Sequence, residues 1–251
     1  MIYKEQFVLI AKEAGINLRE MFRNGEDTAA VKKKEGMSPA IAADIKTERF
    51  ILDAIRKTGF SGTVLSEEAG LVRFGNGTMV IHLDPVDGSR NYMHGIPHYC
   101  ISIGVTEEGK LVLGVVYNPN TDELFVADGE TSFTINGKRA PIYPNKEVLI
   151  VSATDKEELH KLTSNAANRD IKVRFGGSAA LDLCYVAARR FDAAVITKIS
   201  PHDIAAGLLI AKRSGAIIRD IDSREEATIN SRNLIAASSE KLLQRIIEII
   251  R

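Results

Sequence analysis

The sequence lacks the features that would tie the chain to a membrane, an oxidising compartment or a polyanion. No apolar run approaches the length that spans a bilayer, and the N-terminus has no signal-peptide pattern. Cys100 and Cys184 are the only cysteines, and both lie in apolar stretches typical of reduced core thiols. Basic and acidic residues number 33 each, which argues against binding to nucleic acid through bulk charge. These absences predict a cytoplasmic protein with no membrane and no nucleic-acid partner.

Two different patterns divide the 251 residues at about residue 144. In the middle of the chain, short strand-like runs are separated by turn signals, which predicts an antiparallel meander. From residue 148 onward strands and helices alternate, and Pro141 and Pro144 mark the boundary. We therefore predict an α+β fold in stacked layers, with an N-terminal half (1–144) and a C-terminal half (145–251).

Hydrophobic periodicity places the elements within these halves. Helical spacing of apolar residues occurs at 2–23, 42–57, 155–168, 178–190, 202–214 and 239–250. Strand patterns occur at 63–65, 79–83, 99–106, 110–117, 123–127, 132–135, 148–151, 171–175, 192–196, 216–219 and 234–237.

The segment Asp84-Pro85-Val86-Asp87-Gly88-Ser89 carries the strongest chemical signal. It follows the apolar run 79–83, so Asp84 is placed at the carboxyl end of a buried strand, which Pro85 is expected to end. Asp84 and Asp87 would repel each other on such a tight turn unless a cation lay between them, and hard oxygen ligands suit Mg²⁺. The backbone N–H groups around Gly88 and Ser89 could hold an anion, most simply a phosphate.

Other acidic residues stand where such a site would need them, although each has an ordinary structural interpretation. Asp44 and Asp203 each open a predicted helix, where an aspartate commonly acts as a cap or as a partner of the helix dipole. Glu67 and Glu68 follow a short apolar strand, where they could equally form a solvated loop. The sequence alone leaves both interpretations open.

Several other kinds of site are excluded by spacing. Phosphatases of the haloacid dehalogenase type have two aspartates two residues apart, whereas here they are three apart. An EF-hand loop would need oxygen-bearing side chains at Val86 and Gly88, and the chain has no P-loop and no dinucleotide-binding glycine motif. His94 and His98 lie off any predicted helix, so a structural or substrate-side role is favoured over zinc.

Taken together, these segments resemble the signatures of the inositol monophosphatase family. That family belongs to a lithium-sensitive, Mg²⁺-dependent phosphatase superfamily that also holds the fructose-1,6-bisphosphatases. The matching segments are 84–92, 202–207, 66–68, 43–44 and 177–180, with His202 where the family usually has tryptophan. The resemblance implies the layered αβαβα sandwich of the sugar phosphatases, and it is nearest to the archaeal-type inositol monophosphatase/fructose-1,6-bisphosphatases.

The resemblance also implies a role for each matching residue. Two or three Mg²⁺ ions would be coordinated by Glu67, Asp84, the Val86 carbonyl, Asp87 and Asp203. Ser89, with Asp44 and Glu67, would orient and deprotonate the attacking water. Phosphate and substrate would be bound by Asp87, Gly88, Ser89, Arg174, Gly177, Ser178 and Lys198. The mobile loop around Lys33 would close over the metal site.

The function implied by the resemblance is hydrolysis of small sugar or polyol phosphates by metal-activated water. The expected substrates are inositol-1-phosphate, fructose-1,6-bisphosphate or both, and we expect a homodimer. Ile196 stands where inositol-specific members have a glutamate, which argues against strict inositol specificity. Two alternatives remain: a 3′-phosphoadenosine 5′-phosphate phosphatase of the same superfamily, and a non-catalytic metal-binding regulatory protein.

Overall fold

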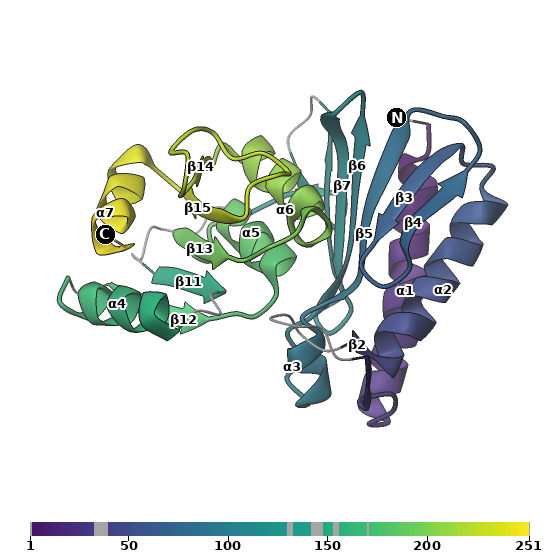
Figure 1. Ribbon diagram of the computed structural model, residues 1–251, viewed down its shortest axis with the longest axis horizontal. Helices are drawn as coiled ribbons and strands as arrows, with labels where there is room; N and C mark the ends of the chain where they lie inside the picture. The colour runs from purple at the N-terminus through teal and green to yellow at the C-terminus, as the bar shows by residue number, and fades with distance from the viewer. Residues whose placement is uncertain are drawn as a thin grey trace.

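Two β-sheets packed against helices form most of the chain that the computed structural model describes (Figure 1). The described residues are 2–32, 40–129, 133–141, 148–152, 156–169 and 171–250. A further two-stranded sheet joins β1 (Ala30–Lys32) and β2 (Ala40–Ile41). Among the helices in these residues, none combines the length and the apolar character that crossing a bilayer requires.

An eight-stranded sheet forms the centre of the N-terminal half. In spatial order its strands are β10 (Lys138–Arg139), β9 (Thr134–Ile135), β8 (Glu123–Asp128), β7 (Lys110–Asn118), β6 (Cys100–Glu107), β5 (Met79–Asp87), β3 (Gly62–Ser66) and β4 (Gly70–Phe74). The helices α1 (Lys4–Arg23) and α2 (Ala42–Lys57) cover one of its faces (Figure 1). Phe7, Leu18 and Ile51 of these helices are fully buried in one core with Ile81 and Val115 of the sheet.

A five-stranded sheet forms the centre of the C-terminal half. In spatial order its strands are β12 (Lys172–Phe175), β11 (Val148–Ser152), β13 (Ala193–Thr197), β15 (Asn233–Ala237) and β14 (Ile217–Asp220). Its helices are α4 (Lys156–Ala167), α5 (Ala179–Ala187), α6 (Pro201–Arg213) and α7 (Glu240–Ile250). Strands β12, β11 and β13 are parallel, and β15 is antiparallel to both of its neighbours.

The helices α5 and α6 lie between the two sheets, while α4 and α7 cover the outer face of the five-stranded sheet (Figure 1). The order of layers is therefore α1 and α2, sheet, α5 and α6, sheet, α4 and α7. This arrangement confirms the predicted αβαβα sandwich. The predicted boundary at residue 144 lies outside the described residues.

Two glycines allow α6 to lie directly on the eight-stranded sheet. A Cβ atom at Gly104 of β6 would lie 2.5 Å from the Cβ atom of Ala205, and one at Gly114 of β7 would lie 2.5 Å from the carbonyl oxygen of Ala206. No side chain could be accommodated at such distances, so glycine is required at both positions. Because Asp203 lies one turn before these alanines, this contact fixes the start of α6 beside the sheet.

The structure agrees with most of the predicted elements and corrects one detail of the central motif. Helix 42–57 is confirmed at both ends, whereas the prediction that Pro85 ends the strand is wrong, since β5 continues to Asp87. Asp84 pairs with Ser102 and Asp87 with Cys100, so β5 has one extra residue there. Such a β-bulge accommodates a proline because the ladder hydrogen bond is already interrupted. The sequence analysis also missed the edge strand β4, whose side chains are exposed or only half-buried.

A buried histidine on β5 gives the fold a predicted acid sensitivity. The side chain of His82 is 3% exposed, and its Nε2 lies 3.1 Å from Oγ1 of Thr106. Burial, reinforced by nearby His202, lowers the pKa of His82 from 6.5 to about 4. The unfolded chain therefore takes up a proton at a higher pH than the folded chain. This difference removes stability as the pH falls from 6.5 toward 4, by up to about 3 kcal/mol.

His82→Gln should reduce this loss of folding stability at low pH. Glutamine stays neutral over the whole range and can still form a hydrogen bond with Thr106. The measurement is the urea midpoint at pH 7, 6, 5 and 4.5. The matched control is His160→Gln, which changes an exposed histidine of α4. Its urea midpoint should fall with pH as steeply as that of the parent protein. Equal slopes in the parent protein and His82→Gln would contradict the prediction.

Candidate active site

The bulge at the end of β5 places two aspartates at the junction of the two halves. Asp84 and Asp87 are 2% and 7% exposed. The Val86 N–H donates a hydrogen bond to Oδ1 of Asp84 at 3.0 Å, which fixes the first carboxylate on the turn. Gly88 follows with φ +102°, and a Cβ atom there would lie 2.8 Å from the carbonyl oxygen of His98. Glycine therefore makes the sharp turn into the short helix α3 (Ser89–Met93) possible.

Asp87 joins this turn to the start of α5, more than ninety residues away. Its Oδ2 accepts hydrogen bonds from the Ser178 hydroxyl and the Ala180 N–H, both at 2.7 Å, and its Oδ1 accepts one from the Ala179 N–H at 3.1 Å. These bonds satisfy N–H groups that the first turn of a helix leaves unpaired. Ser178 is 0% exposed and its hydroxyl is bonded to Asp87, so a contact of this side chain with substrate stays a prediction.

Asp44 and Asp203 each combine a helix cap with a place in the cluster. Oδ2 of Asp44 accepts the Ile41 N–H at 2.7 Å, and its Oδ1 lies 2.9 Å from Oγ of Ser89. Oδ2 of Asp203 accepts the Ser200 N–H at 2.6 Å, and its Oδ1 lies 3.3 Å from Nε2 of His202. The capping interpretation is therefore confirmed for both residues. It does not exclude a second role, because one oxygen of each carboxylate remains on the side away from the cap.

Glu67 is held in place by a residue that the sequence analysis missed. Oε1 of the buried Glu48 accepts hydrogen bonds from the N–H groups of Glu68 at 3.1 Å and Ala69 at 3.0 Å, and from the Ser66 hydroxyl. The Glu67 N–H donates to the carbonyl oxygen of Leu83 at 3.2 Å, which ties the same turn to β5. Glu48 lies four residues after Asp44 on one face of α2, and this spacing was the available signal.

The carboxylates influence one another strongly. Burial raises the pKa of Asp84 well above its usual value, and the charges of Glu67, Asp87, Asp203 and Asp44 raise it further. Burial also raises the pKa of Asp44 and that of Asp87 to about 7, against the opposing effect of their hydrogen bonds. Carboxylates from β5, α2, α6 and the turn after β3 thus converge on one region. At neutral pH such a cluster favours either extra protons or a cation.

The donor set fits a hard divalent cation chemically, although its side chains do not yet enclose one. Within the described residues, no three His, Cys, Asp or Glu side chains are grouped closely enough to hold a metal ion. The hydrogen bonds of the cluster give the reason, since Asp87 directs both oxygens to α5 and the Val86 carbonyl accepts the Ser89 hydroxyl at 2.8 Å. Asp84, Asp87, Asp203 and Glu67 could hold Mg²⁺ after side-chain rotation toward a common point.

Of the other predicted substrate residues, Gly177 is the one that the structure places beside the turn. Gly177 has φ +86°, and a Cβ atom there would lie 3.1 Å from Nδ2 of Asn91, so this loop lies beside α3. Arg174 is exposed and donates to the Val173 carbonyl at 2.9 Å. Lys198 is exposed at φ +58°. Lys33 lies outside the described residues.

Comparison with known proteins gives matches along nearly the whole chain. The sequence model of the inositol monophosphatase family matches residues 3–251. A Thermotoga maritima protein named fructose-1,6-bisphosphatase/inositol-1-monophosphatase is 34% identical, covering 82% of this chain and 80% of its own. A Vibrio cholerae protein named Nus factor SuhB is 32% identical, covering 96% of this chain and 92% of its own. The solved structure of a Thermotoga maritima IMPase matches with a TM-score of 0.88 at 29% identity, covering 100% of this chain and 98% of its own.

Proposed function

Because the chain belongs to the inositol monophosphatase family, we propose that it is a Mg²⁺-dependent phosphomonoesterase acting on small sugar or polyol phosphates. The observation that carries this proposal is the burial of Asp44, Asp84 and Asp87, with the Ser89 hydroxyl in contact with both Asp44 and the Val86 carbonyl of the Asp84 turn. Burying like charges together is unfavourable unless a cation compensates them. Divalent cations held by these carboxylates would bind the phosphate oxygens of a substrate, which is what a metal-dependent phosphatase requires.

The residues of the cluster divide into two sets in the proposed reaction. Glu67, Asp84, the Val86 carbonyl, Asp87 and Asp203 would hold two or three Mg²⁺ ions. Bound Mg²⁺ supplies polarisation of the phosphoryl group and makes water easier to deprotonate. Glu48 and Ser178 act through hydrogen bonds, since they position Glu67 and Asp87.

Asp44 and Ser89 form the proposed path for the proton of the attacking water. Oγ of Ser89 lies 2.9 Å from Oδ1 of Asp44, within hydrogen-bonding distance. Because burial raises the pKa of Asp44 to about 7, its carboxylate is basic enough to accept a proton near neutral pH. Glu67 would help to orient the water. The N–H groups of Gly88 and Ser89 would then bind the phosphate that the water attacks.

We propose a broad polyol specificity that includes inositol-1-phosphate and fructose-1,6-bisphosphate. Ile196 is fully buried in the core of the C-terminal half, so it offers no acceptor for a ring hydroxyl. Arg174 and Lys198 would supply positive charge for a second phosphate. The name of the Thermotoga relative includes both activities, which supports this range. A cytoplasmic location and a homodimer belong to the same proposal.

Phosphate release from a panel of esters tests this function. Inositol-1-phosphate, fructose-1,6-bisphosphate and 3′-phosphoadenosine 5′-phosphate are each assayed with Mg²⁺ and with EDTA. We expect Mg²⁺-dependent release from the first two substrates and a kcat/KM at least about tenfold lower for the nucleotide, a difference of roughly 1.4 kcal/mol. Activity that persists in EDTA would reject the metal assignment, and a preference for the nucleotide would reject the substrate class.

A non-catalytic role is the second candidate, because the Vibrio relative is named as a Nus factor. The same assay separates the two functions. A folded chain that binds Mg²⁺, as measured by calorimetry, yet releases phosphate from none of the esters would support the regulatory role.

A further inference from the structure

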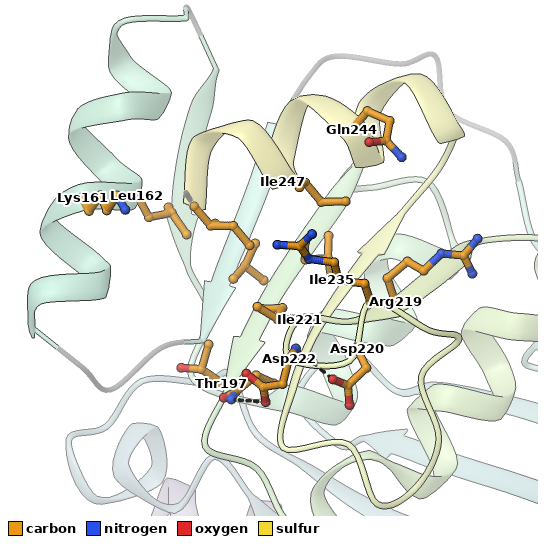
Figure 2. A pocket seen from close by; sticks show the side chains of 14 residues that line it. Lys161, Leu162, Thr197, Arg219, Asp220, Ile221, Asp222, Ile235, Gln244 and Ile247 are labelled. Atoms are coloured by element: carbon orange, nitrogen blue, oxygen red, sulfur yellow. Dashed lines mark hydrogen bonds between the residues drawn. The ribbon is translucent and has the colours of Figure 1, made fainter.

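A cavity lies in the C-terminal half, between the five-stranded sheet and the helices α4 and α7 (Figure 2). Its volume is about 530 Å³, which is within the range of small-molecule sites. The sheet forms the floor, α4 and α7 form the walls, and the segment after β14 forms the rim (Figure 2). The helices α5 and α6 lie between this sheet and the eight-stranded sheet, to which β5 with Asp84 belongs (Figure 1).

The cavity is apolar at its base. Side chains on alternate positions of a strand point to the same face, so Val195 and Thr197 of β13 both face α4 and α7. Ile235 of β15 lies beside them, and Leu162 of α4 and Ile247 of α7 complete the lining. An apolar ring or a short alkyl chain would fit such a surface.

One polar group inside the cavity has no partner within the described residues. Thr197 is 8% exposed, and its hydroxyl makes no hydrogen bond. A buried hydroxyl without a partner is unfavourable, and valine would fill the same space on a strand without that penalty. The hydroxyl is therefore placed to meet a polar atom of a bound molecule.

The rim adds positive charge. Lys161, Arg219 and Arg224 line the cavity together with Asp220 and Asp222. Both acids are engaged by the protein itself. Oδ1 of Asp220 accepts the N–H groups of Asp222 and Ser223 at 2.9 Å, and Oδ2 of Asp222 accepts Nδ2 of Asn233 at 2.8 Å. The two carboxylates keep their charge, so three cations against two acids leave the rim with a formal net charge of +1.

We propose that this cavity binds a small amphipathic anion: an aromatic or short-chain aliphatic monocarboxylate. The apolar body lies against Val195, Ile235 and Ile247, and the carboxylate lies at the rim near Arg224 and Arg219. This site does not depend on the proposed phosphatase function, because it shares none of the carboxylates.

Fluorescence titration with 2-naphthoate tests the proposal on the full chain. The protein has no tryptophan, so the probe is observed without competing indole emission. We expect a dissociation constant of about 1 mM or tighter, and binding of the neutral analogue 2-naphthamide at least fivefold weaker, on the scale of a single screened charge contact.

Two variants and a control locate the bound probe. Arg224→Gln changes an exposed side chain and should weaken 2-naphthoate about fivefold while leaving 2-naphthamide unchanged. Ile235→Phe places a larger side chain without an indole in the cavity and should weaken binding of both probes. Arg213→Gln removes an exposed cation of α6 outside the cavity and should behave as the parent protein. No saturable binding to the parent protein, or equal binding to the parent, Arg224→Gln and Ile235→Phe, would overturn the proposal.

Discussion

Asp203→Asn is expected to lower kcat/KM for phosphate-ester hydrolysis by about 10³-fold or more while leaving the protein folded. A loss of that size corresponds to about 4 kcal/mol of transition-state stabilisation, which is within the contribution of a bound metal ion. The structure explains why folding should survive. Asp203 uses one oxygen to accept the Ser200 N–H at 2.6 Å, and the amide oxygen of asparagine can accept the same bond. The negative charge is lost, and the second oxygen, which lies 3.3 Å from Nε2 of His202, becomes an NH₂ group.

The measurement combines initial rates over a range of Mg²⁺ concentrations with thermal unfolding. The matched control is Asp53→Asn, which makes the same chemical change at a surface carboxylate that pairs with Arg56 on α2. The control should keep the parent activity, since exposed ion pairs contribute little. Parent-like rates for Asp203→Asn at all Mg²⁺ concentrations would remove Asp203 from the metal site.

Asp87→Asn is a less informative variant than Asp203→Asn, although the sequence motifs favour Asp87 and Asp203 equally as metal ligands. Both oxygens of Asp87 accept hydrogen bonds from the start of α5. An asparagine must direct its NH₂ group toward one of these donors, so the change would destabilise the junction of the two halves as well as the metal site.

Asp84→Asn is expected to make the metal-free protein more stable, by about 1–3 kcal/mol at pH 8, while abolishing activity. Asp84 is buried among carboxylates that raise its pKa. The sign follows from this direction. A carboxyl whose pKa is raised by folding contributes its full stability below its ordinary pKa of 3.8, and that contribution is lost as the pH rises through the folded pKa. Asparagine does not titrate, so the advantage of the variant should grow from pH 5.5 to pH 8.

Mg²⁺ should reverse this order of stability. A ligand that binds only the folded state at 100 times its dissociation constant adds about 2.7 kcal/mol, and the parent protein alone should receive this gain. The measurement is thermal unfolding of both proteins at pH 5.5 and pH 8, with EDTA or with Mg²⁺. An Asp84→Asn protein that is less stable than its parent in EDTA at pH 8 would contradict the charge-repulsion argument.

The sequence predicted the layers well because their signals are local. Helix α2 and the strands of the meander are set by hydrophobic periodicity and by turns between them, and both are visible in a short window. The bulge in β5 is not visible in this way, because it depends on how Asp84 and Asp87 pair with β6. A proline inside a strand pattern normally indicates that the strand ends there. In β5, pairing with β6 continues past the proline.

The candidate site shows the same division. Asp44, Glu67, Asp84 and Asp203 could be proposed from motifs, but their mutual influence became apparent only from tertiary structure. Glu48 matched no motif, and its one signal was its spacing four residues after Asp44, although it holds the turn that contains Glu67. Ser178 was assigned to the substrate by its neighbours in sequence, whereas its hydroxyl contacts a carboxylate from the other half of the chain.

The contact of α6 with Gly104 and Gly114 limits which parts of the molecule can move during turnover. The backbone of the helix touches the backbone of the sheet, so the helix cannot tilt inward without steric overlap, and moving outward would open a void in a packed interior. Asp203 thus lies on a helix that cannot shift, so in the proposed reaction its carboxylate would move only by rotation about its own side-chain bonds. We expect larger movements in segments that lack such a close backbone contact. Such a division predicts slow amide hydrogen exchange along α6 and faster exchange in the loop at Gly177.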